Sequence, residues 1–440
     1  MRVGLISMSG VRVRSEELAA LGVSLPGFVQ RGKVIASLPS LAMLTLAAVT
    51  PADVEVEYLE VADIHLHGMR TDFDLIGMST FTAMAYECYE LADRYRAAGI
   101  PVVIGGLHAM LMPEEAKAHA DAVCVGEGES QWPLILEDAR KGQLKPFYRE
   151  AKPGSYDIST TPIPRYDLLD IERYNRLTVQ TTRGCPLDCE FCAASKIYGR
   201  YRIKPVEQVM REIDAIEAVW TNPFIELADD NTFVNKDWAK RFLREMGDRN
   251  IRWFTETDIS VADDPELLDL LAKSGCQQIL IGFESVAPEN LDGIDRASWK
   301  RKRLDGYRKS IEAIQSKGIT VNGCFILGLD GDTPDTFETV RDFILDSNLL
   351  ESQVTVLTPF PNTRLYHRLK AEGRLLQDAY WDRCTLFDVN FRPKHMSVRE
   401  LEEGLMFLFA ELYNEQVYAR RKRHYMEIYK NLTAAGHVAP

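Results

Sequence analysis

The sequence predicts an α/β protein built from two successive parallel sheets and a mostly helical C-terminal region. Short apolar runs alternate with helix-length segments through the first 145 or so residues, and the same alternation returns between residues 176 and 365. Apolar strands that alternate with helices form parallel sheets covered on both faces. Residues 398–423 keep the helical period without a strand, so the chain is expected to end in helices.

The first alternation, over residues 1–145, predicts a doubly wound parallel sheet. In such a sheet, ligands bind beyond the carboxyl ends of the strands. Residues 146–175 combine Pro, Gly, Ser and Thr and show no apolar period, which is typical of a linker. The expected strands of the first sheet are residues 2–7, 54–59, 75–79, 102–105 and 122–125.

The second alternation contains six strand–helix units and predicts a partial (β/α)6 barrel over residues 176–365. An active site is expected at the carboxyl ends of its strands, as in complete barrels. Residues 366–440 are expected to form a helical region that caps the substrate. The six expected strands are residues 177–182, 224–228, 252–258, 278–284, 321–329 and 353–359.

Composition narrows the class of protein. The chain has 440 residues, of which 46% are apolar and 27% charged, and a formal net charge of −13. This acidity argues against a nucleic-acid binder, which needs a basic surface; the basic run 419–424 is expected to be a solvated helix face. No apolar run reaches the roughly 18 residues that span a bilayer, and the start MRVGLIS lacks the order of a signal peptide. The expected location is the cytoplasm.

Three of the eight cysteines stand together directly after the first barrel strand. Cys185, Cys189 and Cys192 have the spacing Cys-x3-Cys-x2-Cys. Closely spaced thiolates hold iron–sulfur clusters. Three thiolates bind three irons of a [4Fe–4S] cube and leave the fourth iron open to another ligand. The alternative is a zinc site, which needs a fourth ligand; no suitable Cys or His is nearby, although Glu190 could serve.

This cysteine loop resembles the signature of the radical S-adenosylmethionine (SAM) superfamily, and the resemblance extends over residues 176–365. It implies that Phe191, beside the last cysteine, lies near the adenine of SAM. It also implies that polar and small residues at other strand ends hold SAM or order the site. A carboxylate at a strand end can instead cap the next helix. The candidates are Asp229, Asp230, Glu284, Ser285, Gly328 and Thr358.

Three further motifs follow strands of the N-terminal sheet. Glycines at such positions let a ligand approach the backbone closely, and small hydroxyl side chains can bond deep in the crevice. The plain alternative is a flavodoxin-like sheet with ordinary turn glycines. The motifs contain Ser79, Thr80 and Phe81; Gly105, Gly106 and Leu107; and Glu127 and Gly128.

Together these motifs resemble the cobalamin-binding domain of class B radical SAM enzymes, in the usual order before the radical core. A bulky side chain at Gly105 or Gly106 is then expected to block the nucleotide tail. One feature departs from the domains that supply a histidine below cobalt: the first strand is not followed by Asp-x-His-x-x-Gly. His65 and His67 follow the second strand instead. The resemblance therefore implies cobalamin without a histidine ligand from this domain.

The combined resemblance implies a cobalamin-dependent radical SAM enzyme, expected to be a C-methyltransferase that acts on an unactivated carbon. The alternatives are a cyclase, a ring-rearranging enzyme or a carbon-coupling enzyme, in which the first domain need not bind cobalamin. A B12-binding or redox-sensing protein is the non-enzymatic alternative. The expected substrate is a small molecule, lipid, tetrapyrrole or peptide, and the expected electron donor is flavodoxin or ferredoxin.

Overall fold

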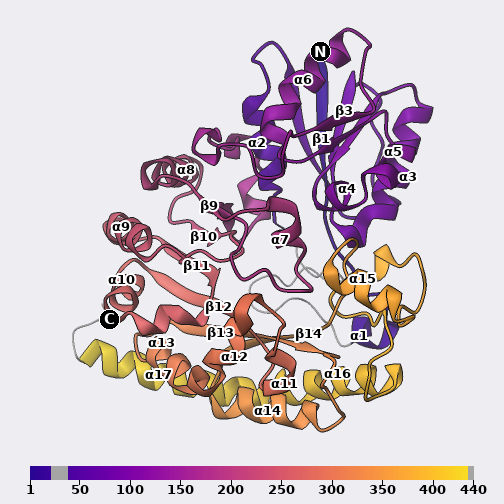
Figure 1. The fold of residues 1–440 in the computed structure, drawn as a ribbon. Coiled ribbons are helices and arrows are strands. Elements are labelled where there is room, and N and C mark those ends of the chain that lie inside the picture. Colours follow the sequence, from indigo (N-terminus) through magenta and orange to yellow (C-terminus); the bar gives the residue numbers. More distant parts are fainter. Residues whose placement is uncertain (21–37, 435–440) are drawn as a thin grey trace.

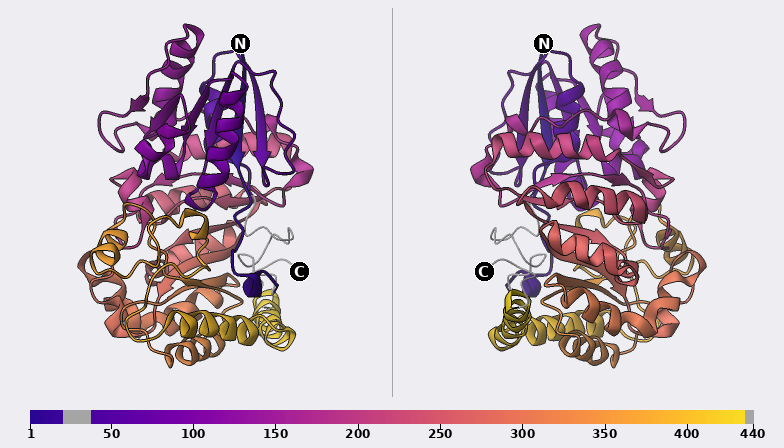
Figure 2. Two further views of the ribbon diagram at one scale, coloured as in Figure 1. Left: turned by 90° about the vertical axis from the view of Figure 1, so that its right-hand side faces the viewer. Right: turned by 90° about the vertical axis from the view of Figure 1, so that its left-hand side faces the viewer.

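Two parallel sheets, stacked one above the other, organise the molecule (Figure 1). The computed structural model describes residues 1–20 and 38–434. The N-terminal sheet lies above the barrel in both views of Figure 2. No helix among the described residues is long and apolar enough to cross a membrane.

The N-terminal sheet has six strands, all parallel. Its strands are β1 (Arg2–Met8), β2 (Glu55–Val61), β3 (Leu75–Ser79), β4 (Val102–Gly105), β5 (Ala122–Val125) and β6 (Phe147–Arg149). They stand in the order β2-β1-β3-β4-β5-β6. Helices α2 (Leu41–Val49) and α6 (Gly128–Arg140) pack on one face, whereas α3 (Ala85–Ala97) packs on the other. The predicted doubly wound sheet is therefore confirmed.

Strand β6 pairs with β5 at the edge of this sheet. It lies within residues 146–175, for which the sequence predicts a linker, and it was not predicted. Three residues are too few to show the two-residue period of a strand. Two short helices, α4 (Leu107–Leu111) and α5 (Pro113–Ala118), connect β4 to β5.

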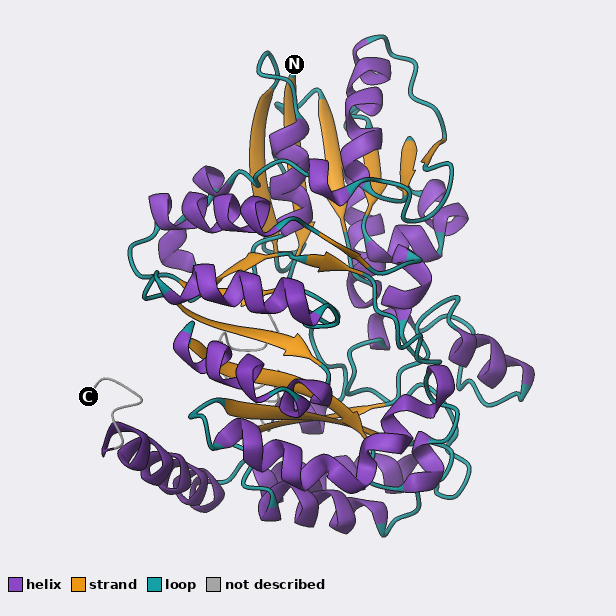
Figure 3. Ribbon diagram, turned by 60° about the vertical axis from the view of Figure 1, so that its left-hand side comes forward, coloured by secondary structure: helices purple, strands orange, loops and turns teal. Residues whose placement is uncertain are grey.

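The second sheet also has six parallel strands, in the order β14-β13-β12-β11-β10-β7. It curves as an open barrel with helices on its outer side (Figure 3), as predicted. The strands are β7 (Leu177–Val179), β10 (Phe224–Leu227), β11 (Arg252–Thr257), β12 (Cys276–Glu284), β13 (Thr320–Leu327) and β14 (Glu351–Val356). The outer helices are α8 (Val206–Val219), α9 (Lys236–Gly247), α10 (Pro265–Lys273), α13 (Tyr307–Gln315) and α14 (Thr336–Asp346).

The sequence of α9 shows why these helices form and how they attach. The Asn235 side chain caps its first turn by accepting a hydrogen bond from the amide of Trp238. Ala239, Phe242 and Met246 are buried at helical spacing, so one apolar stripe faces the sheet.

A two-stranded antiparallel ribbon carries the cysteine loop. It consists of β8 (Thr182–Arg183) and β9 (Arg202–Ile203), with α7 (Ala193–Tyr198) between them. The short helices α11 (Pro288–Leu291) and α12 (Trp299–Arg303) follow β12. The segment between them contacts the loop, where the amide of Glu190 donates to the carbonyl of Ile294 at 2.9 Å.

The C-terminal helices occupy two different ends of the barrel. Helix α15 (Arg364–Ala371) lies at the carboxyl ends of the strands, whereas α16 (Val398–Leu412) packs on α14. Helix α17 (Glu415–Ala434) crosses the amino ends, where Tyr429 donates to the carbonyl of Gly318 at 3.0 Å. A capping role at the mouth is therefore open to the part near α15 and not to α17. Arg421 of the basic run is buried, so that run is only partly the solvated face that was expected.

The carboxyl ends of the N-terminal sheet face the mouth of the barrel (Figure 1). Beyond β1 the chain runs toward the C-terminal region, where the amide of Arg14 donates to Asp388 at 3.0 Å. Beyond β4, the carbonyl of Leu111 accepts from Asn362 at 3.3 Å. Trp381 donates to Glu115 of α5 at 3.0 Å. These contacts join the N-terminal domain to the C-terminal region near the carboxyl ends of both sheets, where a ligand of either sheet is expected.

Candidate active site

The three cysteines of the loop are partly exposed and have no disulfide partners. Burial raises the pKa of Cys185 to about 11, and it raises the pKa of Cys189 as well; the neighbouring Cys192 adds to both increases. A bound cation offsets this cost of forming thiolates. The side-chain amide of Asn231 faces the Cys185 sulfur at 3.9 Å. Three grouped thiols without covalent partners therefore fit an iron–sulfur cluster.

The same cysteines do not form a single-ion site. No three His, Cys, Asp or Glu side chains in the described part of the chain gather as the ligands of one metal ion do. A cube is attached through three different irons, so its cysteines need not converge on one point. Glu190, the candidate fourth ligand of the zinc alternative, binds the Arg368 guanidinium at 2.6 and 3.1 Å.

A buried network of ions ties the cysteine loop to the N-terminal sheet. Arg183, in β8, binds Glu127 and Glu129 at 2.5 Å each. Arg202, in β9, binds the second oxygen of Glu127 at 2.7 Å. All four side chains are at least nine-tenths buried. Glu127, a candidate cobalamin residue, therefore has both carboxylate oxygens engaged by arginines.

Helix α15 holds the loop from the other side. Besides the contact between Arg368 and Glu190, Arg364 binds Asp188 at 2.9 Å. The amide of Leu365 also donates to the carbonyl of Glu190 at 3.2 Å. The cysteine loop is thus fixed between the N-terminal sheet and the C-terminal region.

The two aspartates after β10 have different surroundings. Asp229 is buried and accepts from the amides of Thr181 and Thr182 at 2.7 Å and from the hydroxyl of Thr232 at 3.0 Å. It therefore fixes the chain just before the cysteine loop. Among the residues that the structure describes, the Asp230 carboxylate accepts from the amide of Gly184 alone, at 3.2 Å, and it is exposed at the mouth. Desolvation and the adjacent Asp229 raise the pKa of Asp230 to about 6.

Glu284 stands at the end of β12 with a left-handed φ of 62°, an unfavourable conformation for a residue with a side chain. Its carboxylate binds the ammonium of Lys300 at 3.0 Å. Lys300 is only 5% exposed and also donates to the carbonyl of Gly282 at 2.5 Å. Glu284 holds the pKa of Lys300 above its ordinary value despite burial, and Cys189 contributes in the same direction. The pair therefore stands beside the second cysteine.

The sequence analysis missed Lys300 because it lies in a run of basic residues that reads as an exposed helix face. The only sequence feature that indicates its ion pair with Glu284 is that Lys300 follows the strand that ends at Glu284. The other predicted site residues of the barrel mainly shape the mouth. Phe191 is partly buried against the core, and Ser285, Gly328 and Thr358 make local backbone contacts.

Gly328 shows how tightly the mouth is packed. Its φ is +87°, and a Cβ there would meet Leu401 and Phe391 at 2.9 Å each. The amide of Gly328 donates to Asp332 at 2.8 Å. Glycine is thus required where β13 turns against the C-terminal region.

Two further carboxylates, Glu226 and Glu256, were not predicted and lie inside the barrel. Glu226 of β10 binds Arg176 at 2.5 Å. The side-chain carboxyl of Glu256, in β11, has no hydrogen-bond or ion-pair partner among the described residues, whereas its backbone carbonyl accepts from the amide of Thr232 at 3.1 Å. Burial raises the pKa of Glu256 to about 8, and Glu226 repels its charged form. Burial also raises the pKa of Cys324 in the neighbouring part of the barrel, and the charge of Glu256 adds to that increase. A charged residue in the middle of a buried strand is the signal that could have found it.

The two glycines after β4 differ in what surrounds them. Gly106 has a φ of +88°, and a Cβ there would meet the Ser79 hydroxyl at 2.6 Å and the Thr80 amide at 2.9 Å. The local fold itself therefore requires Gly106. At Gly105 a Cβ would meet only Cys124, at 3.5 and 3.8 Å. Gly105 can thus accept a side chain that projects beyond the strand end.

Other candidate cobalamin residues line the same strand ends. Phe81 is 51% exposed directly after β3. Ser79 and Leu107 are partly exposed, whereas Thr80 is buried and donates to the carbonyl of Phe81. A Cβ on Gly128 would meet Leu46 at 2.9 Å. The exposed ring, the open strand end and the partly exposed hydroxyl fit a large ligand.

No histidine follows β1 in the described residues. His108 is fully buried after β4 and contacts Thr82 and Glu115 at 3.3 Å each. His65 is exposed beyond the edge strand β2. The absence of a histidine ligand below cobalt stays a prediction, and its test is spectroscopic.

A barrel with an open three-cysteine loop, joined to a doubly wound sheet, defines a radical SAM enzyme with a cobalamin-binding domain. Family models agree: the B12 binding domain matches residues 31–136 and the radical SAM superfamily matches residues 179–344. A domain of unknown function matches residues 363–439.

Relatives extend over most of the chain. It is 30% identical over 394 residues to the uncharacterized methyltransferase sll1242 of Synechocystis, covering 87% of this chain and 72% of the relative. It is 28% identical over 355 residues to bacteriochlorophyllide d C-12(1)-methyltransferase of Chlorobaculum tepidum, covering 79% and 76%. The chain belongs to the cobalamin-dependent (class B) radical SAM family.

Solved structures share the fold. The cobalamin-dependent SAM radical enzyme OxsB, with aqua-cobalamin bound, has a TM-score of 0.68 at 14% identity, covering 97% of this chain and 71% of that one. The radical SAM methyltransferase TsrM from Kitasatospora setae, with cobalamin and a [4Fe–4S] cluster bound, has a TM-score of 0.65 at 18% identity, covering 86% and 79%.

Proposed function

We propose that this enzyme transfers a methyl group to an unactivated carbon of a small-molecule substrate. The observation that carries the proposal is the position of the cysteine loop, which buried ion pairs hold against the cobalamin-binding sheet. Both cofactors of the family then act on one enclosed space. When bound, the cluster and SAM supply a 5′-deoxyadenosyl radical, and cobalamin supplies the methyl group.

Different residues of the chain are proposed to bind the cluster and SAM. Cys185, Cys189 and Cys192 hold the cluster. Asp230 offers a carboxylate with spare acceptor capacity at the mouth, and Glu284 offers a second, beside Lys300. These three side chains suit the charged amino and carboxylate groups of SAM. Asp229 positions the loop, because its oxygens are already occupied by Thr181, Thr182 and Thr232.

Phe191, Ser285, Gly328 and Thr358 are proposed to shape the SAM pocket. The remaining candidates are proposed to line the cobalamin crevice: Ser79, Thr80, Phe81, Gly105, Gly106, Leu107 and Gly128. Glu127 serves in this proposal by positioning the crevice against the loop. Residues 364–396 are proposed to enclose the substrate. Its chemical class is proposed to be a tetrapyrrole, because one relative methylates bacteriochlorophyllide d.

An external one-electron donor, flavodoxin or ferredoxin, is part of this proposal. All eight cysteines are free thiols, which fits a reducing compartment, and we assign the enzyme to the cytoplasm.

The test begins with anaerobic purification and reconstitution with iron, sulfide and hydroxocobalamin. The wild-type protein should retain iron, sulfide and cobalt after gel filtration and should produce 5′-deoxyadenosine from SAM with dithionite. The Cys185→Ala/Cys189→Ala/Cys192→Ala variant should lose the cluster absorbance and SAM cleavage but keep cobalt. Full iron retention in that variant would contradict the cluster assignment.

Methyl transfer has its own readout. Assays with SAM that carries a deuterated methyl group and with bacteriochlorophyllide precursors should give a product heavier by the labelled methyl group. Formation of 5′-deoxyadenosine with an altered substrate and no label would reject methyl transfer and retain the radical SAM assignment.

A further inference from the structure

Helix α17 is attached to the barrel along one of its long sides. Arg421 and Tyr425 are buried, and Leu432 packs over Gly318, where a Cβ would meet it at 2.9 Å. Most of the other side chains of the helix are exposed. Figure 3 shows α17 at the edge of the molecule, at the lower left. The opposite long side of the helix therefore faces away from the barrel.

Three large side chains on this outward side are exposed. The exposed fraction is 61% for Tyr418, 50% for Met426 and 36% for Tyr429. Single exposed apolar residues are ordinary on a protein surface. Spacings of eight and three residues, however, place these three on one side of the helix. They form an interrupted apolar stripe.

Three cations surround the side chain of Met426. Lys422 and Arg423 stand four and three residues before it, and Lys430 stands four residues after it. These are the positions of neighbours on a helix surface. All three cations are exposed, and none has a hydrogen-bond or ion-pair partner within the described residues. We call the following residues the α17 patch: Tyr418, Lys422, Arg423, Met426, Tyr429 and Lys430.

The acidic residues of the helix do not neutralise this patch. Glu427 follows Met426 directly, so its side chain points about 100° away around the helix. Glu415 is the first residue of α17 and stands seven residues, or about two turns, before Lys422. The patch is therefore positive, although the chain has a formal net charge of −13.

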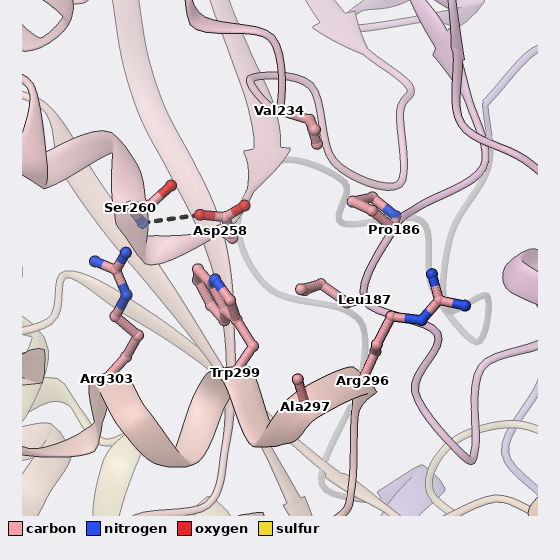
Figure 4. A pocket seen from close by; sticks show the side chains of 9 residues that line it. All are labelled: Pro186, Leu187, Val234, Asp258, Ser260, Arg296, Ala297, Trp299 and Arg303. Atoms are coloured by element: carbon pink, nitrogen blue, oxygen red, sulfur yellow. Dashed lines mark hydrogen bonds between the residues drawn. The ribbon is translucent and has the colours of Figure 1, made fainter.

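The cations of a surface pocket beside the cysteine loop, by contrast, share that pocket with acidic groups. The pocket has a volume of about 350 Å³, and its lining includes Arg296, Arg303 and Asp258 (Figure 4). Arg303 also pairs with Asp263. Positive charge at this pocket thus meets negative charge of the same chain, whereas that of the α17 patch does not.

We propose that the α17 patch is the docking surface for an anionic phospholipid bilayer, which the enzyme binds peripherally. Lysine, arginine and tyrosine side chains combine an apolar stem or ring with a polar tip, which suits the headgroup layer of a bilayer. Met426, at the centre of the patch, can enter the boundary of the acyl chains while the three cations contact lipid phosphates. The proposal does not depend on the reaction proposed above.

The dimensions of the patch favour an extended surface over a small anion. From Lys422 to Lys430 the helix rises about 12 Å, so one phosphate cannot bridge the cations at both ends. A bilayer presents many headgroups in one plane, and each cation near that plane contributes to binding. At physiological ionic strength, exposed charges separated by more than about 8 Å are largely screened. The distant acidic groups of the chain therefore do not cancel this attraction.

Docking through α17 leaves the mouth of the barrel open. The helix crosses the amino ends of the barrel strands, where Tyr429 donates to the carbonyl of Gly318. The N-terminal sheet lies at the other end of the molecule, beyond the carboxyl ends of those strands (Figure 1). The bilayer would therefore lie on the side opposite to the mouth, and it would not block the entry of substrate.

The test is sedimentation of the reconstituted full-length enzyme with vesicles of equal parts phosphatidylglycerol and phosphatidylcholine. The wild type should bind them. The Lys422→Glu/Arg423→Glu variant should have a partition coefficient at least about tenfold lower, because each lost cation weakens the attraction to the headgroups. Added salt should weaken wild-type binding, and vesicles of phosphatidylcholine alone should bind neither protein.

A second variant tests the apolar part of the contact. Met426→Ser keeps every charge and should bind the anionic vesicles at least about threefold more weakly, because its side chain no longer enters the lipid interface. Wild-type affinity in Met426→Ser would contradict contact between the helix and the interface.

The matched control is Arg211→Glu/Lys273→Glu, which reverses two exposed cations on α8 and α10. It changes the net charge of the chain by the same amount and should bind the anionic vesicles as the wild type does. Circular dichroism and the yield of 5′-deoxyadenosine with dithionite should be equal in all variants, because every substituted residue lies outside the proposed active site.

Four outcomes would overturn the proposal. A wild type that does not bind the anionic vesicles would do so, and so would wild-type binding by Lys422→Glu/Arg423→Glu. An equal loss in the control would show that general charge explains the effect. Inorganic phosphate that displaces the enzyme from the vesicles at constant ionic strength would replace the bilayer with a small anion. Self-association that Lys422→Glu/Arg423→Glu abolishes, without vesicle binding, would make the patch an interface between copies.

Discussion

The guanidinium of Arg183 binds the carboxylate of Glu127 at 2.5 Å, and both side chains are buried. Arg183 stands two residues before Cys185, whereas Glu127 stands beside the first turn of α6 in the N-terminal sheet. The contact therefore joins the cluster loop to the cobalamin-binding domain without an intervening flexible segment. A movement of the N-terminal sheet is therefore expected to move the cluster loop with it.

Removal of one side of this network should destabilise the protein strongly. Glu127→Ala leaves the buried Arg202 without a carboxylate and leaves Arg183 with Glu129 alone, and loss of one partner of a buried ion pair costs about 3–5 kcal/mol. Chemical denaturation of the apoprotein should show this decrease in the free energy of unfolding. Glu137→Ala, on the exposed face of the same helix, is the control and should change it by less than about 0.5 kcal/mol. Similar stabilities for the two variants would show that the network contributes little.

Loss of the carboxylate at the end of β12 should weaken SAM binding while the cluster persists. Glu284→Ala removes the partner of Lys300, so the buried ammonium has to find another anion or become neutral. Calorimetric titration with SAM should show weaker binding, and iron analysis should show a full cluster. The double variant Glu284→Gln/Lys300→Met removes both charges and should recover stability without recovering SAM affinity. SAM affinity equal to wild type in Glu284→Ala would contradict this role.

Gly105 and Gly106 should respond differently to substitution. Gly105→Leu adds a side chain where only Cys124 is near, so the fold should persist while the crevice is filled. Cobalt analysis after gel filtration should then show loss of cobalamin with normal circular dichroism. Gly106→Leu is also expected to block cobalamin without unfolding the barrel, but its Cβ would meet Ser79 and Thr80, so it should strain the turn after β4 as well.

Retention of cobalt by Gly105→Leu would place the nucleotide tail elsewhere. Paramagnetic spectra of Co(II) in the wild type complete this test. Nitrogen hyperfine coupling from a histidine of the N-terminal domain would contradict the absent ligand and leave cobalamin binding intact.

The unpaired Glu256 should make stability depend on pH. Because its pKa is about 8 in the folded protein and about 4.3 in an unfolded chain, the folded state keeps a proton that the unfolded state releases. The free energy of unfolding therefore falls as pH rises between these two values. Glu256→Gln removes this loss and should gain about 2 kcal/mol over wild type between pH 6 and pH 8.

Denaturation of the apoproteins at both pH values measures this difference. The substitution Glu245→Gln, at a partly exposed carboxylate on α9, is the control and should show no such change. A Glu256→Gln advantage that is the same at both pH values would mean that the carboxyl titrates normally in the folded state.

Much of the architecture follows from sequence because each strand–helix unit carries its own local pattern. The six barrel strands and the cysteine loop after the first of them were predicted in the correct order. Strand β6 was not predicted because it is too short to show periodicity. The two glutamates that bind Arg183 were not predicted because they are 54 and 56 residues away and belong to the other sheet. The burial of Lys300 was not predicted because burial of one lysine in a basic run depends on the tertiary fold.

The two sides of the cysteine loop become available at different times during synthesis. Glu127 and Glu129 precede the loop, so their contact with Arg183 can form as soon as the barrel ribbon leaves the ribosome. Arg368 follows Glu190 by 178 residues. A nascent chain that already carries all three cysteines therefore lacks the second half of their support. The loop reaches its finished geometry only after α15 has been translated, so we expect cluster insertion to be a late step in the maturation of this enzyme.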